Sequence, residues 1–170
     1  MEKVWKKVSK KVEGLSIVEN ILYSKGIVEK EDIEEFLSDK PQRTHDPFMI
    51  KNMTEAVGRI IYHITKKNKI VIAGDYDVDG VTSTALLLEF FSNITKNIDY
   101  YIPNRFTEGY GLNLDAIKHI KEEMKADLII TVDNGISAVK EIDYANELGL
   151  EVIVTDHHNP PETLPNCIII

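Results

Sequence analysis

The sequence predicts an α/β fold, with a mainly parallel sheet flanked by helices and preceded by a helical N-terminal arm. From residue 51 onward, short segments rich in β-branched residues alternate with longer amphipathic segments, a pattern typical of strands that alternate with helices. Three of the short segments end in acidic or histidine side chains. With 170 residues, of which 43% are apolar, the chain can form one domain with an added arm.

Residues 1–50 are expected to form the helical arm. Ser16 is a suitable N-cap for a helix over residues 17–24, and a second helix is expected from Glu29 to Leu37. The basic residues at the N-terminus favour an exposed, solvated segment over a contact with a nucleic-acid backbone; they are Lys3, Lys6, Lys7, Lys10 and Lys11.

Residues 51–170 are expected to form the α/β domain. Apolar spacing predicts strands over residues 70–73, 98–102, 127–132 and 151–155, the second of them at an edge. Helices are predicted over residues 54–66, 113–124 and 138–148, with another after residue 82. The expected N-caps of three of these helices are Thr54, Thr82 or Ser83, and Ser137. The final run Ile168–Ile170 looks like the start of a further strand, which predicts that the chain is a fragment.

Three carboxylates follow the first predicted strand. Asp75, Asp77 and Asp79 occupy alternate positions, so in an extended segment they face the same side. Such like charges raise one another's pKa unless a cation lies among them. Magnesium and manganese prefer oxygen ligands and are the first candidates. Gly80 is expected to allow a sharp turn before the next helix.

Two other interpretations of this acidic motif remain open. A calcium-binding EF-hand loop also begins Asp-x-Asp-x-Asp-Gly, but it follows a helix and needs Glu at its twelfth position, where this chain has Leu86. The pair Asp77 and Asp79 also imitates the nucleophile motif of haloacid-dehalogenase-type phosphatases. In that motif the first Asp directly ends the strand, whereas here residues 74–76 intervene.

The other two polar motifs lie after the strands predicted over residues 127–132 and 151–155. Asp133 by itself is an ordinary turn residue, but Asp156, His157 and His158 form a more informative group. Neighbouring residues of an extended segment point to opposite sides, so one histidine is expected to ligate a metal and the other to reach the substrate. Asp156 can orient one of the histidine rings by accepting a hydrogen bond from the remaining N–H of that ring.

The three motifs are expected to converge, because parallel sheets place their sites beyond the carboxyl ends of the strands. Acids with histidine in one crevice suit hydrolysis of a phosphoester or pyrophosphate assisted by two metal ions. Arg105, in the loop of residues 103–111, can clamp a phosphate oxygen or be an ordinary surface residue. These residue types alone do not identify the substrate.

Charge, cysteine content and the length of the apolar runs limit the class of protein. Residues 1–70 carry 14 Lys and Arg against 11 Asp and Glu, whereas residues 71–170 carry 6 against 17. Bound cations would offset this acidic half, so the net charge of -8 does not exclude a phosphodiester substrate. Cys167 is the only cysteine, so neither a disulfide framework nor a thiolate zinc site is expected. No apolar run approaches membrane-spanning length, and a cytoplasmic protein without membrane contact is expected.

Three motifs resemble motifs I, II and III of the DHH phosphoesterase superfamily: residues 74–83, residues 132–137 and residues 155–158. Segments 46–48 with 51–53, 101–105 and 108–113 resemble a branch of that superfamily, the single-strand-specific 5′ to 3′ exodeoxyribonucleases. The resemblance implies a DHH-type, Rossmann-like domain over residues 51–170 that stops before the fourth motif. It also implies single-stranded DNA as substrate and a role in DNA repair and recombination, with repair and single-strand-binding proteins as candidate partners.

Roles are carried over from the resemblance by position. The implied metal ligands are Asp77, Asp79, Asp133 and His157, and the implied cofactor is Mn²⁺ or Mg²⁺, at a two-metal site in the complete protein. Asp75 and Asp156 are expected to support or bridge these ligands, and His158 to contact the scissile phosphate or assist the leaving group. The candidate substrate-binding residues are Arg105, Asn104 and Asn134. The alternatives are a phosphodiesterase of short oligonucleotides or cyclic dinucleotides, and a non-catalytic scaffold with the same fold.

Overall fold

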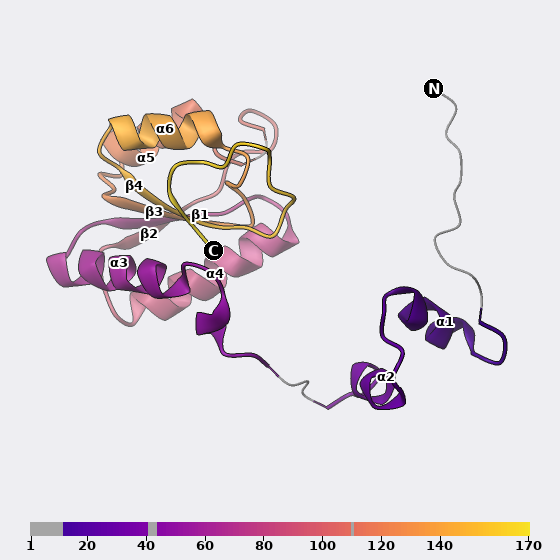
Figure 1. Ribbon diagram of the computed structural model, residues 1–170. Coiled ribbons are helices and arrows are strands. Elements are labelled where there is room, and N and C mark those ends of the chain that lie inside the picture. The colour runs from indigo at the N-terminus through magenta and orange to yellow at the C-terminus, as the bar shows by residue number, and fades with distance from the viewer. Residues whose placement is uncertain (1–11, 41–43, 110) are drawn as a thin grey trace, which may run out of the picture. The chain divides into compact units, whose positions relative to one another are not determined.

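The computed structural model describes residues 12–40, 44–109 and 111–170. The chain packs as two compact units, residues 1–46 and residues 47–170, which Figure 1 labels by element. The predicted extents of arm and domain, residues 1–50 and 51–170, stay a prediction. The basic N-terminal lysines lie outside the described residues.

The first unit contains two short helices, α1 (Ile17–Ser24) and α2 (Lys30–Phe36). The predicted cap of α1 is confirmed: Ser16 Oγ accepts from the Glu19 backbone N–H at 3.2 Å, and the Glu19 carboxylate accepts from the Ser16 N–H at 2.7 Å. In these helices Leu22 is the buried residue. Ile17 and Ile21 of α1 are exposed.

The second unit is a five-stranded, entirely parallel sheet with the order β2-β1-β3-β4-β5. The predicted parallel sheet and its edge strand are confirmed. The strands are β1 (Ile70–Ala73), β2 (Ile98–Tyr101), β3 (Leu128–Val132), β4 (Glu151–Thr155) and β5 (Ile168–Ile169). All five residues of β3 are buried, as expected for a strand covered on both faces.

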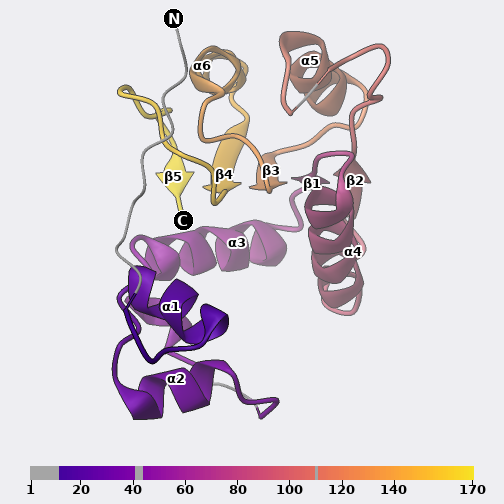
Figure 2. The ribbon, with the colours of Figure 1, turned by 90° about the vertical axis from the view of Figure 1, so that its right-hand side faces the viewer.

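Helices cover both faces of the sheet (Figures 1 and 2). On one face, strand residues such as Ile70 and Ile72 pack in a cluster with residues of α3 (Met53–Lys66) and α4 (Val78–Ser92). On the other, Val71 and Ala73 pack with residues of α5 (Leu114–Glu122) and α6 (Val139–Glu147). Alternate residues of β1 therefore serve opposite layers. None of the helices in the described ranges is long and apolar enough to cross a membrane.

The predicted N-caps of α3 and α6 are wrong, although both helices are present. Helix α3 follows the 3-10 turn η1 (Pro47–Met49), and its N-cap is Asn52 instead of Thr54. Asn52 has φ 63°, and its side-chain amide donates to Ile169 O at 2.9 Å. A tertiary hydrogen bond thus fixes this helix start. Helix α6 begins after Ala138, without a side-chain cap from Ser137.

A buried polar network joins α3 to the start of β4. Arg59 Nε and Nη2 donate to the two carboxylate oxygens of Glu151 at 2.7 and 2.5 Å. The buried ring of His63 contacts the same carboxylate through Nε2 at 3.1 Å, and its Nδ1 lies 3.0 Å from Asn68 Nδ2. His63 is thus a structural residue. The Arg59 guanidinium is the main cause of the lowered pKa of Glu151.

We expect the Glu151 network to stabilise the protein at neutral pH and to weaken in acid. Because the folded pKa is lowered, the contribution is complete above the unfolded pKa of about 4.3 and is lost as pH falls through the folded value. Glu151→Ala leaves the buried His63 N–H without its acceptor, which costs about 1–3 kcal/mol. Urea unfolding should show a larger difference from the parent at pH 7 than at pH 3.5. The exposed Glu147→Ala is the control; an equal effect from it would contradict this expectation.

Candidate metal centre

The acidic motif after β1 is not extended, in contrast to the prediction. Asp77 is the N-cap of α4, and its Oδ1 accepts from the Gly80 N–H at 3.1 Å. Helix α4 therefore begins before Thr82 and Ser83, which lie inside it. The physical reason is that an aspartate placed before a helix satisfies its first N–H groups. Gly80 is a helical residue whose added Cβ would lie 2.5 Å from the backbone N and O of Asp75.

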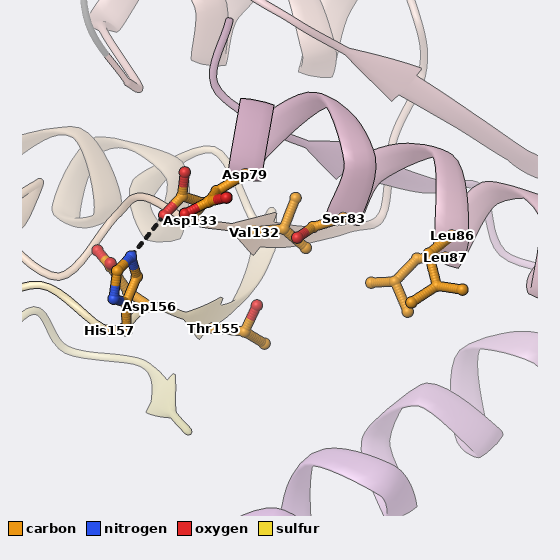
Figure 3. A pocket seen from close by; sticks show the side chains of 9 residues that line it. All are labelled: Asp79, Ser83, Leu86, Leu87, Val132, Asp133, Thr155, Asp156 and His157. Carbon is orange, nitrogen blue, oxygen red and sulfur yellow. Dashed lines mark hydrogen bonds and ion pairs between the residues drawn. The ribbon is translucent and has the colours of Figure 1, made fainter. Parts of the chain in front are cut away.

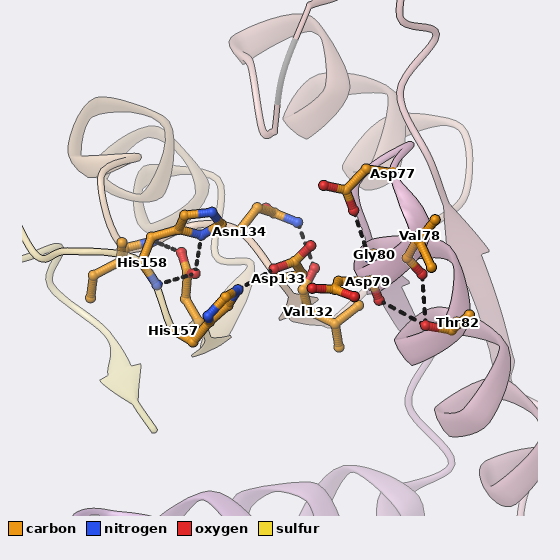
Figure 4. A network of polar contacts seen from close by, with 12 residues as sticks. Asp77, Val78, Asp79, Gly80, Thr82, Val132, Asp133, Asn134, His157 and His158 are labelled. Atoms are coloured by element: carbon orange, nitrogen blue, oxygen red, sulfur yellow. Dashed lines mark hydrogen bonds and ion pairs between the residues drawn. The ribbon is translucent and has the colours of Figure 1, made fainter. Parts of the chain in front are cut away.

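As a result, the three acids of this motif occupy different environments. Asp75 is 0% exposed, and among the described residues neither of its carboxylate oxygens has a hydrogen-bonding partner. Asp77 and Asp79 are exposed. Figures 3 and 4 both show Asp79, from the first turn of α4, beside Asp133. The expectation that all three acids face one side is therefore wrong, because Asp75 is enclosed while the other two are open to solvent.

Asp133 lies at the end of β3 in a backbone conformation that few residues adopt. Its φ is +62° and its residue exposure is 8%; aspartate is among the residues that tolerate this left-handed region. Its N–H donates to Thr155 O at 3.0 Å, which extends the pairing of β3 and β4. Gly135 follows with φ +107°, and an added Cβ there would lie 2.9 Å from Thr131 Oγ1. The turn thus presents Asp133 just beyond the sheet.

Asn134 is buried beneath this turn. Its Nδ2 donates to Ala73 O at 3.1 Å and to Val132 O at 2.9 Å. Its residue exposure is 1%. Both amide hydrogens are used within the fold, so this geometry gives no support to the predicted contact between Asn134 and substrate.

The two histidines after β4 lie together, although the sequence predicted opposite sides. Their ring centroids are 4.7 Å apart. The chain bends at Asp156, whose Oδ1 accepts from the His158 N–H at 3.0 Å, and such Asx turns replace the extended backbone that was assumed. His157 Nε2 lies 3.0 Å from Asp133 Oδ1. This contact brings the second and third motifs together.

Asp156 connects the third motif to the turn after β3. Its Oδ2 accepts from the Ile136 N–H at 2.9 Å, while Oδ1 lies 2.7 Å from His158 Nδ1. Burial alone would raise the pKa of Asp156, but the hydrogen bonds from Ile136 and His158 together lower it. The hydrogen bond to Asp156 is also the main cause of the raised pKa of His158. The carboxylate therefore fixes the orientation of this ring, as predicted from the sequence.

The pKa values of Asp133 and Asp77 are shifted in opposite directions. Burial and then the nearby Asp77 raise the pKa of Asp133. The hydrogen bond from the Gly80 N–H is the main cause of the lowered pKa of Asp77. One carboxylate is thus stabilised by a helix start, while its neighbour resists ionisation. A cation bound between them would remove the repulsion.

The structure brings one potential ligand set into close range. Ligand atoms of Asp133, His157 and His158 all lie within 4.8 Å of one another. An adjoining cavity of about 540 Å³ opens along α4 (Figure 3), and it is lined by Asp79, Ser83, Leu86, Leu87, Val132, Asp133, Thr155, Asp156 and His157. Three strand ends therefore contribute to one mouth of the sheet, which was the central prediction from the sequence.

Arg105 lies in the loop after β2, and its guanidinium carbon is 5.2 Å from the centroid of the Tyr76 ring. This cation–π contact holds Arg105 against the acidic motif. Asn104 is used within the loop, because its Oδ1 accepts from the Phe106 N–H at 2.9 Å. Glu108 accepts hydrogen bonds from the Asn104 N–H and from the Tyr101 hydroxyl. The loop is thus held at its base, and Phe106 is 94% exposed.

Sequence reasoning missed the threonines that support the site. Thr131 Oγ1 donates to Asn134 O at 2.7 Å, and Thr155 Oγ1 donates to Thr131 O at 2.6 Å. A threonine next to a polar motif in an otherwise aliphatic strand is a usable signal, because a buried hydroxyl needs a partner. No sequence signal shows which backbone carbonyl it reaches.

Residues 69–170 match the DHH family, N-terminal domain. The single-stranded-DNA-specific exonuclease RecJ of Bacillus subtilis (strain 168) is 47% identical over 150 residues, which are 88% of this chain and 19% of that protein. The protein of the same name from Escherichia coli (strain K12) is 44% identical over 121 residues, 70% of this chain and 21% of its own length. The chain spans about a fifth of the length of these curated relatives.

Solved structures of similar proteins agree with the fold. An exonuclease RecJ bound to manganese has a TM-score of 0.65 and 36% identity, covering 71% of this chain and 31% of that one. RecJ in complex with Mn²⁺ from Thermus thermophilus has a TM-score of 0.61 and 31% identity, covering 76% of this chain and 18% of that one. The family match extends over more than half of the sequence and includes all three polar motifs. The chain therefore belongs to the DHH family.

Proposed function

We propose that this chain forms part of a metal-dependent exonuclease that hydrolyses phosphodiester bonds of single-stranded DNA in the 5′ to 3′ direction, in DNA repair and recombination. The observation that carries the proposal is the convergence of Asp133, His157 and His158 at one mouth of the sheet. Relatives described as single-stranded-DNA-specific exonucleases, at up to 47% identity, support the substrate. The proposal includes cytoplasmic location and repair or single-strand-binding proteins as partners.

The residues present fit manganese or magnesium. Carboxylate oxygens with imidazole nitrogen suit both ions, with histidine favouring manganese, and the raised pKa of Asp133 is the property expected of an acid that needs a cation beside it. We assign the ligands to Asp77, Asp79, Asp133 and His157. When bound, two such ions activate water and stabilise charge on the phosphate and leaving oxygens.

The remaining polar residues are assigned supporting tasks. Asp156 holds His158 through Nδ1, so this ring is suited to contact the scissile phosphate or assist the leaving group. Asp75 lies buried behind the first turn of α4, where it can support the neighbouring ligands. Arg105 and Asn104 are assigned to the DNA backbone, with the guanidinium as a paired donor to a phosphate oxygen.

The direct test is an exonuclease assay of the full-length protein on 5′-labelled single-stranded DNA with manganese. Asp77→Ala should abolish activity, and Asp77→Asn should do so while retaining a side chain that caps α4. Equal activity of parent and variants would refute the proposal. Release of mononucleotides from dinucleotides, with long strands left intact, would instead assign the site to short oligonucleotides.

Arg105→Ala should raise the KM for single-stranded DNA by about 10-fold or more, because a charged hydrogen bond contributes about 1.5–3 kcal/mol. The value of kcat should change much less, since Arg105 is proposed to hold the DNA backbone away from the reacting atoms. Steady-state kinetics at several salt concentrations measure both constants. Lys118→Ala removes an exposed charge elsewhere and is the control; the same rise in KM in both variants would indicate only a general charge effect.

A further inference from the structure

The turn that carries Asp133 is tied to the neighbouring strand β1 by the side chain of Asn134. The two hydrogen bonds from Asn134 Nδ2 reach the last carbonyl of β1, Ala73 O, at 3.1 Å and the last carbonyl of β3, Val132 O, at 2.9 Å. Ala73 and Thr131 are the last paired residues of these two strands. The side chain therefore joins the strands just where their own pairing ends, as Figure 4 shows for Val132.

This connection links the turn that carries Asp133 to the end of β1, which leads into the acidic motif. Asp133 immediately precedes Asn134, and Asp77 follows Ala73 by four residues. On its other side the turn is held by β4, because the Asp133 N–H donates to Thr155 O at 3.0 Å. The turn is thus anchored to both neighbouring strands, and the Asn134 amide is its anchor toward the acidic motif.

We infer that Asn134 is a positioning residue, which sets the separation between Asp133 and the acids at the start of α4 and thereby tunes metal affinity. The inference rests on the proposed function, since it assumes that these acids share bound metal. It assigns Asn134 a task different from substrate binding, because both of its amide hydrogens are already used and the residue is 1% exposed.

The chemistry of the position explains why an amide is needed. Two carbonyl oxygens of adjacent strands require two N–H donors from one planar group, which asparagine supplies. Aspartate has the same shape, but it has no donor and would place a charge beside two carbonyl oxygens. Alanine leaves both carbonyls without this partner and releases the end of β1 from the turn.

The test is a manganese titration of the full-length protein, followed by the electron paramagnetic resonance signal of free Mn²⁺. Asn134→Ala should weaken manganese binding by about 10- to 100-fold, the usual effect of losing a group that supports metal ligands, and Asn134→Asp should weaken it more. Circular dichroism at the titration temperature identifies the folded variants, and Asn134→Ser replaces any variant that does not fold. Unchanged manganese affinity in the folded variants would overturn the inference.

A matched control separates positioning from simple destabilisation. Asn52→Ala also removes a hydrogen bond from a side-chain amide to a backbone carbonyl, Ile169 O at 2.9 Å, but Asn52 lies outside the three motifs. It should lower the melting temperature and leave manganese affinity unchanged; weakening equal to that of Asn134→Ala would overturn the inference.

Kinetics separate this inference from the proposed function. A raised KM for DNA with normal manganese binding in Asn134→Ala would restore the substrate-contact role and overturn the inference. If the parent protein itself binds no manganese, the proposed function fails as well. If the parent binds manganese and degrades DNA while the Asn134 variants match it, only the inference fails.

Discussion

Asp133→Asn should abolish manganese-dependent exonuclease activity and, at the same time, raise the melting temperature of the metal-free protein. The pKa of Asp133 is raised by burial and by Asp77, so its charge opposes folding when no cation is bound. Asparagine tolerates the left-handed backbone at φ +62°, and its side-chain oxygen can still accept from His157. The change therefore removes the charge and keeps the shape.

The expected loss of activity is more than about 100-fold, because replacing even a supporting group costs about 10- to 100-fold. Thermal melts with and without manganese check both parts of the prediction. The parent should gain stability when manganese is added, whereas the variant should start higher and gain little. Asp143→Asn, the same change on the exposed side of α6, should alter neither property. A variant that is less stable than the parent without metal would contradict the electrostatic argument.

Gly80→Ala should be the most destabilising single change at the site. An added Cβ would lie 2.5 Å from the backbone N and O of Asp75, and backbone atoms cannot rotate away as a side chain can. Overpacking typically costs about 1–3 kcal/mol and occasionally more, and the displaced start of α4 would carry Asp77 and Asp79 with it. We expect loss of both manganese binding and cooperative unfolding.

Gly58→Ala makes the same chemical change and should raise stability instead of lowering it. Gly58 lies inside α3, and its added Cβ would have no neighbour within 4 Å. Alanine is favoured over glycine in a helix by about 0.5–1 kcal/mol, so this variant should be more stable and fully active. Denaturant unfolding of the two variants checks the pair, and equal effects would contradict the steric argument.

The layered fold could be predicted because periodicity reports burial directly. Apolar runs such as Ile70–Ala73 and residues 152–154 lie within the observed strands β1 and β4, since the buried positions of strands covered on both faces need apolar residues. The convergence of the three motifs follows from the parallel order alone. Contacts such as that between His157 and Asp133 were therefore foreseeable at the level of the strand ends.

The local geometry could not be predicted, because short polar side chains compete for backbone groups. Asp77 accepts a hydrogen bond from the Gly80 N–H, so α4 starts earlier than predicted. Asp156 accepts a hydrogen bond from the His158 N–H, and the chain bends there. Both events replace the extended backbone on which the alternation argument depended. The hydrogen bond from Asn134 to Ala73 could not be predicted for a different reason, because the two residues are distant in sequence.

The position of Asp77 has a practical consequence for mutagenesis. One carboxylate both starts α4 and is assigned to the metal, so an alanine there mixes a folding defect with a chemical one. Serine retains a hydroxyl that accepts from the same N–H yet carries no charge. The Asp77→Ser variant should fold normally and bind DNA without cleaving it. It is therefore the suitable inactive form for crystallising a complex with substrate.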